Sequence, residues 1–141
     1  IINFFPEERR AQLLMDLSLN LRGMISQRLI PLKEGKGRIA AVEVMLNSPL
    51  IADLIFKGEV ARVKEIMAKS TRIGMQTFDQ DLFALYERGA ISYEDAMRNA
   101  DSKNELRLRV KLESKRDKKP LDTDGLALAE DEGTDRGVIR L

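Results

Sequence analysis

The chain has 141 residues, enough for one domain with one hydrophobic core. Apolar residues make up 43% and charged residues 33%, a balance typical of a helical globular protein. A net charge of +1 argues against nucleic-acid binding along the chain. The absence of cysteine and histidine excludes disulfides, thiol nucleophiles, imidazole bases and the usual zinc sites. Carboxylate chemistry with magnesium stays open.

The first predicted element is a helix that begins at Pro6. Proline is favoured at the first helical position, where its missing N–H is not needed, and Glu7 and Glu8 suit the positive end of the helix dipole. The apolar stripe of this helix is predicted, at helical spacing, on Leu14, Leu17, Leu21 and Met24 or Ile25.

A β-hairpin is predicted next. Residues 33–37 contain two glycines, which can adopt positive φ. A short apolar run lies on each side of them: Leu29, Ile30 and Leu32 before, and Ile39, Val42, Val44 and Leu46 after. Gly35-Lys36-Gly37-Arg38 has a phosphate loop as its alternative interpretation. That motif needs a serine or threonine after the lysine and a following helix, whereas a strand-like run follows here. The sequence therefore favours a plain hairpin turn.

Two short helices are predicted between residues 48 and 70. Ser48 and Pro49 form a start signal and Gly58 a stop, and the buried face is predicted on Leu50, Ile51, Leu54 and Ile55. Core packing is the default for such a stripe, with a partner-binding ridge as the alternative. The second helix runs from about Glu59 to the break at residues 70–74, with its inward positions at Val60, Val63, Ile66 and Met67.

Two further helices have explicit local signals. Thr77 and Gln80 form a capping box, and the helix that follows is predicted to end at Gly89 and to bury Phe78, Leu82, Leu85 and Tyr86. Ser92 with Asp95 caps the next helix, which runs to about Asn99.

Charge separates sharply after residue 100. Residues 103–119 hold eight Lys or Arg against three acids, whereas residues 120–141 hold six acids against two Arg. A helix is predicted to continue to about Ser114, and the chain after Pro120 is predicted to be disordered because it cannot bury enough apolar surface. Residues 103–119 could contact anionic lipid, nucleic acid or an acidic neighbour. Because no aromatic is present to stack on bases, we favour a solvated helix or an intramolecular partner for the acidic tail over a nucleic-acid site.

Three carboxylates invite an acid–base interpretation, namely Glu43, Asp79 and Asp81. Catalysis needs a positioned partner and a shifted pKa, and the sequence shows neither. Acids in the first turn of a helix are favoured by its dipole, so a structural role is predicted for Asp79 and Asp81. Glu43, flanked by Val42 and Val44, is predicted to be solvated or paired.

Three ordered stretches of the chain resemble the C-terminal end of the type IV pilus retraction ATPases, a branch of the secretion ATPase family. They are residues 26–29 (Ser-Gln-Arg-Leu), 37–44 (Gly-Arg-Ile-Ala-Ala-Val-Glu-Val) and 74–80 (Gly-Met-Gln-Thr-Phe-Asp-Gln). Residues 1–6 resemble the segment that follows the histidine-bearing motif of that family. The start on an apolar hexamer without Met also leads us to expect a fragment.

The main motors of this family carry a retraction signature that falls on residues 50–57 of this chain. Its apolar positions are kept, but both of its arginines and its final acid are replaced, by Ala52, Phe56 and Lys57. This departure and the long charged tail resemble the accessory retraction ATPases more than the main motors.

The residue patterns predict a mainly α chain with one antiparallel β-hairpin. The resemblance implies that residues 1–100 are the C-terminal part of a RecA-like α/β ATPase domain (helix, hairpin and helical subdomain). Residues 101–141 are predicted to be a charged C-terminal extension, helical at first and then disordered. The implied parent is a hexameric cytoplasmic ATPase, peripheral at the inner membrane, that powers pilus retraction and twitching motility in the accessory role.

In that family, ATP and Mg are bound by residues upstream of this segment, so we predict no catalytic, cofactor-binding or metal-binding residue here. Contacts with a partner or between elements are predicted at Ile51, Asp53, Leu54 and Ile55. The implied partners are further copies of the parent in a homo-hexamer, the main retraction ATPase and the inner-membrane pilus platform protein, without nucleic acid. The alternatives are another secretion or pilus assembly ATPase and a non-enzymatic helical interaction module.

Overall fold

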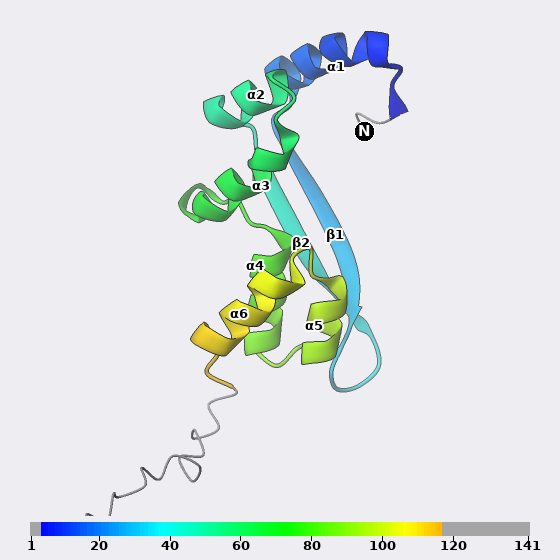
Figure 1. Ribbon diagram of the computed structural model, residues 1–141. Coiled ribbons are helices and arrows are strands. Elements are labelled where there is room, and N and C mark those ends of the chain that lie inside the picture. The colour runs from blue at the N-terminus through cyan, green and yellow to red at the C-terminus, as the bar shows by residue number, and fades with distance from the viewer. Residues whose placement is uncertain (1–3, 117–141) are drawn as a thin grey trace, which may run out of the picture.

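The computed structural model describes residues 4–116, which are mostly helical with one antiparallel two-stranded sheet (Figure 1). Strands β1 (Gly23–Pro31) and β2 (Arg38–Leu46) form a long hairpin along the molecule. Helices α1 (Glu7–Asn20), α2 (Pro49–Phe56) and α3 (Val60–Lys69) gather at one end of the hairpin and form what we call the first lobe. Helices α4 (Phe78–Glu87), α5 (Tyr93–Asn99) and α6 (Lys103–Glu113) lie along its other end and form the second lobe.

The predicted hairpin is confirmed. Gly23 pairs with Leu46 at one end and Pro31 with Arg38 at the other, and the connecting loop contains Gly35 at φ 85°. Because successive side chains alternate between the two sides of a strand, one side of the hairpin is buried under the helices, with Ile30 and Ala41 fully buried and Met45 nearly so. The opposite side exposes Ile25 and Leu29.

The start of the hairpin corrects one prediction. Met24 or Ile25 is expected from the sequence to continue the apolar stripe of the first helix, but α1 ends at Asn20 and β1 begins at Gly23. Leu21 already has extended backbone angles, and pairing of Met24 with Met45 fixes the strand. A short apolar run fits both helical and strand periodicity, so only the pairing partner decides. Pro6 precedes α1 instead of being its first residue, a shift within ordinary boundary variation.

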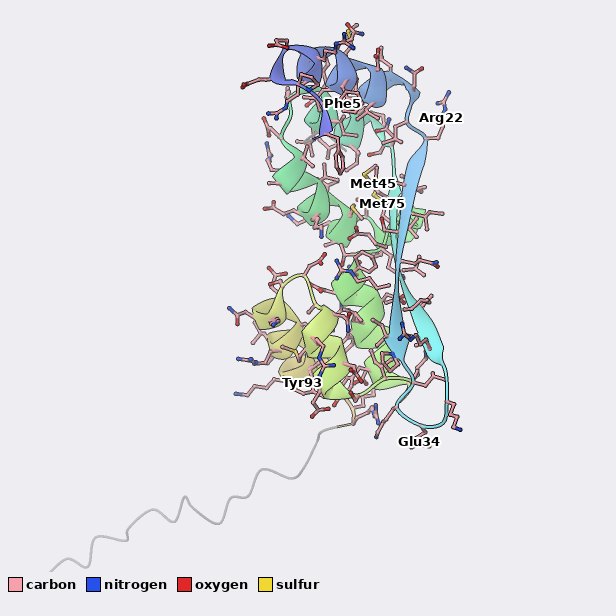
Figure 2. All side chains as sticks on the ribbon, turned by 90° about the vertical axis from the view of Figure 1, so that its right-hand side faces the viewer. Phe5, Arg22, Glu34, Met45, Met75 and Tyr93 are labelled. Atoms are coloured by element: carbon pink, nitrogen blue, oxygen red, sulfur yellow. The ribbon has the colours of Figure 1, made fainter. Side chains whose placement is uncertain are left out.

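The first lobe packs around an aliphatic core rich in methionine. It contains Met45, Ile51, Leu54, Ile55, Val63, Met67 and Met75, with Leu14, Leu17, Leu21 and Ile66 packed at its edge. In Figure 2, Met45 and Met75 lie together at this core, and Glu34 marks the far hairpin loop. Ser48 caps α2 by accepting from the Ile51 N–H at 3.4 Å, as predicted.

Two predicted inward positions of the first lobe are wrong. Leu50 is 51% and Val60 44% exposed. Each lies at the first turn of its helix, on the flank of the buried stripe, so that neighbouring helices cover only the residues one turn further on.

The second lobe is defined by the local signals predicted for it. The capping box is present, with the Gln80 N–H donating to Thr77 Oγ1 at 3.3 Å and the Thr77 N–H donating to Gln80 Oε1 at 3.0 Å. Ser92 Oγ accepts from the Asp95 N–H at 3.0 Å, and Gly89 ends α4 with φ 78°. The core residues are Ile30, Ala41, Phe78, Leu82, Leu85, Tyr86, Ile91, Ala96, Leu106 and Val110.

The last described helix, α6, belongs to this core. It ends at Glu113, close to the predicted end at Ser114, and its Leu106 and Val110 are buried. Residues on both sides of the predicted boundary at residue 100 therefore share one core, and the division into residues 1–100 and 101–141 stays a prediction. The predicted disorder after Pro120 lies outside the described residues.

Candidate functional site

The contact residues predicted on α2 divide into two groups. Ile51, Leu54 and Ile55 are buried at the junction of α2 with α1 and α3. Asp53 points to solvent, where Lys57 Nζ lies 2.7 Å from its carboxylate. The three apolar side chains thus make contacts between elements, and a partner contact through Asp53 stays a prediction.

The two acids at the start of α4 tie elements together, as their predicted structural role requires. Asp79 accepts hydrogen bonds from the backbone N–H groups of Asp101 and Ser102, at 2.8 and 2.9 Å. Asp81 accepts from the N–H of Val42 at 2.7 Å. Asp79 therefore holds the link between α5 and α6, and Asp81 joins α4 to β2.

A charged cluster crosses the boundary between the two lobes, and we call it the polar seam: Arg28, Glu43, Lys64, Asp79 and Asp101. Arg28 on β1 donates to Asp101 at 2.7 Å, and Lys64 on α3 donates to the other oxygen of the same carboxylate. Lys64 also lies 3.8 Å from Glu43 on β2. Asp101 thus binds one cation from the hairpin and one from the first lobe.

Arg28 is fixed by more than its charge. Its guanidinium lies 4.0 Å from the ring centroid of Phe78 and donates to the backbone carbonyl of Asn99 at 2.5 Å. A guanidinium held by a ring face, a carbonyl and a carboxylate has one orientation. Arg28 therefore joins β1 to α4 and to the end of α5.

The electrostatics of the seam keep both partners charged. Burial acts to raise the pKa of Asp101, but hydrogen bonds from Lys64 and Arg28 outweigh it and leave that pKa below its ordinary value of 3.8. Burial acts to lower the pKa of Lys64, and the hydrogen bond to Asp101 with the charge of Glu43 raises it above 10.5. The lowered pKa makes the Asp101 carboxylate a weaker base, and the raised pKa makes the Lys64 ammonium a weaker acid, so both shifts suit a structural joint and not proton transfer.

A cavity of about 600 Å³ lies beside the seam, between α3 and the helices α4 and α6. Its walls carry both signs of charge: Lys64, Lys69 and Arg109 against Glu65, Asp79, Asp101 and Glu105. Two of the cations are already paired, Lys64 with Asp101 and Arg109 with Glu113. The cavity therefore has no strong preference for an anion or a cation.

The glycine-lysine turn at residues 35–38 does not have the surroundings of a phosphate loop. The glycine-lysine turn closes with the Leu32 N–H donating to the Gly37 carbonyl at 3.2 Å, and β2 follows it at Arg38. The turn therefore leads into a strand and not into a helix whose N-terminus could bind phosphate oxygens, as a phosphate loop does. Within residues 4–116, no group of three or more acidic side chains could hold a metal ion, and no helix is long and apolar enough to cross a membrane.

Comparison with known proteins identifies the segment. No family model matches the chain. The type IV pilus ATPase PilU of Pseudomonas aeruginosa is 55% identical to it over 91% of this chain and 34% of that protein. The chain belongs to the type IV pilus retraction ATPase family. The retraction ATPase PilT of the same organism is 39% identical over 71% of the chain and 29% of its own length.

A solved structure of the pilus retraction motor PilT with bound ADP shares the fold of this family member. The two match with a TM-score of 0.66 and 35% identity, over 77% of this chain and 29% of that one. The chain spans about one third of the length of the curated relatives it matches. The fold is consistent with the C-terminal part of the ATPase domain expected from the sequence.

The polar seam of this retraction-ATPase segment was missed at the level of sequence. Arg28 and Asp101 are 73 residues apart, and no short-range rule connects them. One signal was available: Arg28 shares the inward side of β1 with Ile30, and a charge on a side that is otherwise buried requires a partner. The sequence does not say which acid supplies it.

Proposed function

We propose that the parent protein is a hexameric ATPase that powers type IV pilus retraction and twitching motility in the accessory role. The greater identity to PilU than to PilT, over more of the chain, carries this proposal. The replaced positions Ala52 and Phe56 on α2, and Lys57 just after it, support the accessory role over that of the main motor.

In this proposal ATP and Mg bind outside the segment, through residues upstream of it. The bound ADP of the solved PilT structure supports nucleotide binding by the parent. The hairpin turn lacks the helix that a phosphate loop needs, so this segment supplies contacts between elements and no catalytic group. Its buried α2 residues hold the first lobe together and its polar seam joins the two lobes, as a part that transmits domain movement must.

The proposed partners are the other copies of the parent in a homo-hexamer, the main retraction ATPase and the inner-membrane pilus platform protein. In this proposal the parent protein is cytoplasmic and peripheral at the inner membrane, and it binds no nucleic acid. The exposed side of α2, with Asp53 and Leu50, is the surface we assign to such contacts.

The test begins with the gene. A G-x-x-x-x-G-K-[ST] loop is expected upstream of Ile1, and its absence would end the ATPase proposal. The next step is a clean deletion, complemented either by the wild-type gene or by a variant in which the lysine of that loop is replaced by alanine. Reduced twitching and reduced retraction force, restored by the wild-type gene, are expected; unchanged values contradict the accessory role.

An assembly motor of the same wider family gives a different result in that experiment. Loss of an assembly motor leaves cells without surface pili, whereas loss of an accessory retraction ATPase leaves cells piliated but slow to retract. Counting surface pili by electron microscopy in the deletion strain therefore separates the two. A purified fragment of residues 1–141 is expected to show no ATP hydrolysis above a heat-treated control.

A further inference from the structure

The outward side of α6 is an amphipathic surface without a cover among residues 4–116. Leu108 is 57% and Leu112 71% exposed, one helical turn apart. Arg107 and Lys111, also one turn apart, are exposed beside them. We call these four residues the outer face of α6. The opposite side of the helix is already used, since it is buried against the second lobe.

The cations of the outer face have no ion-pair partner among residues 4–116, unlike Arg109 on the same helix. Arg109 pairs with Glu113 at 3.0 Å and lies 4.5 Å from the ring centroid of Phe83. No carboxylate of residues 4–116 forms an ion pair with Arg107 or Lys111. A strip of two leucines beside two free cations fits an occupant that offers apolar side chains between carboxylates.

The chain contains such a segment. Residues 121–132 read Leu-Asp-Thr-Asp-Gly-Leu-Ala-Leu-Ala-Glu-Asp-Glu, with Leu126 and Leu128 between two acidic groups and no basic residue. We propose that this acidic segment docks on the outer face of α6 within the same chain, with its leucines against Leu108 and Leu112 and its acids beside Arg107 and Lys111.

The connection is short enough for this contact. Ser114 Oγ donates to Glu87, and the Arg116 guanidinium donates to the carbonyl of Tyr86, so the chain leaves α6 at a fixed point. Four residues, 117–120, separate this point from Leu121 and reach about 13 Å when extended. The nearest part of the outer face, Lys111 and Leu112, lies within the preceding turn and a half of chain.

A weak contact is sufficient for docking, because the acidic segment is tethered to α6. A short linker gives the tethered segment an effective concentration on the order of millimolar. Exposed charge pairs are screened over about 10 Å at 0.1 M salt, so the docking is expected to weaken as salt rises. Such docking requires neither ATP hydrolysis nor pilus retraction.

The direct test is a disulfide cross-link in the full-length protein, after any cysteines outside this chain are changed to serine. The chain itself has none. Leu108→Cys combined with Leu128→Cys is expected to cross-link within one chain about tenfold or more faster than the control, Leu19→Cys with Leu128→Cys. Leu19 is 66% exposed on α1 and Leu108 57%, so the control cysteine is at least as accessible. Equal rates would overturn the proposal.

A charge swap provides the second measurement. Arg107→Glu with Lys111→Glu is expected to slow the cross-link to the control rate, and adding Glu130→Lys with Glu132→Lys is expected to restore it. Failure of the swap to restore the rate, or a product that links two chains on a denaturing gel, contradicts docking within one chain. Hydrogen exchange of residues 103–113 that slows only when vesicles with anionic lipid are added would assign the face to a membrane surface instead.

Discussion

The two lobes share one hairpin but are specified in different ways. In the second lobe each helix begins at a side-chain cap: Thr77, Ser92 and Ser102 all accept a hydrogen bond from a backbone N–H of the first turn. In the first lobe, α1 and α3 have no side-chain cap bond, and α1 buries no residue fully. Local capping residues thus specify most helix starts of the second lobe, whereas the first lobe depends more on packing between its helices.

The cores differ in the same direction. Aromatic rings stiffen the second lobe, where Tyr86 and Tyr93 pack edge to face at 6.0 Å (Tyr93 is labelled in Figure 2) and Arg28 lies over Phe78. The first-lobe core contains no aromatic and three methionines, which adapt to gaps. The lobe whose helices have strong local signals thus has a core of rigid aromatic rings, and the lobe without them has a core of adaptable methionines.

The largest expected effect comes from deleting a matched leucine in each core. Leu85→Ala in the second lobe and Leu54→Ala in the first should each lower the free energy of unfolding by about 2–5 kcal/mol. Leu85→Ala should cost more, because methionines around Leu54 can move into the space. Hydrogen-exchange mass spectrometry of the full-length protein, with peptides from each lobe, measures both. A larger loss for Leu54→Ala would reverse the comparison.

The next effect tests the local signals. Thr77→Ala removes the capping box of α4 and should cost about 1 kcal/mol. Ser70→Ala serves as control, because Ser70 precedes the short 3₁₀ helix η2 (Thr71–Ile73) without a side-chain cap bond. Faster exchange confined to the first turns of α4 is expected for Thr77→Ala and little change for the control. If the two variants behave alike, local capping is not what distinguishes the lobes.

The joint between the lobes should respond to acid. The pKa of Asp101 is lowered in the folded state, so its stabilising contribution is complete above the ordinary value of 3.8. The contribution is lost as the pH falls from 3.8 through the lowered pKa. Exchange at the amides of Asp101 and Ser102 should accelerate in that range. Asp101→Asn should remove this acid step while Asp53→Asn keeps it; a step that persists in Asp101→Asn would exclude the seam as its source.

The smallest effect compares two lysines that are equally exposed. Lys57 and Lys64 are 54% and 53% exposed and each pairs with an aspartate. Lys57→Ala should leave exchange unchanged, because exposed pairs within one helix contribute little. Lys64→Ala should accelerate exchange at Asp101, since Lys64 connects the lobes. An identical response from both variants would show that the seam does not couple them.

The extent of successful prediction follows the same division. The capping box at Thr77, the glycine at position 89 and the hairpin turn at residues 33–37 were readable because each depends on residues within four positions. The predictions were wrong at Met24, Leu50 and Val60, where the apolar pattern fits more than one helix face or strand pairing. Their burial depends on which neighbour covers them, and that neighbour is distant in the chain.

By itself the sequence determined the order of elements, the ends of the second-lobe helices and, through three ordered motifs, the family. Only the tertiary structure decided that Arg28, Lys64 and Asp101 meet at one carboxylate, and that Leu106 and Val110 join the core formed by α4 and α5. Local signals act through backbone hydrogen bonds within one or two turns. Contacts between residues tens of positions apart depend instead on the packing of whole elements, which no short stretch of sequence specifies.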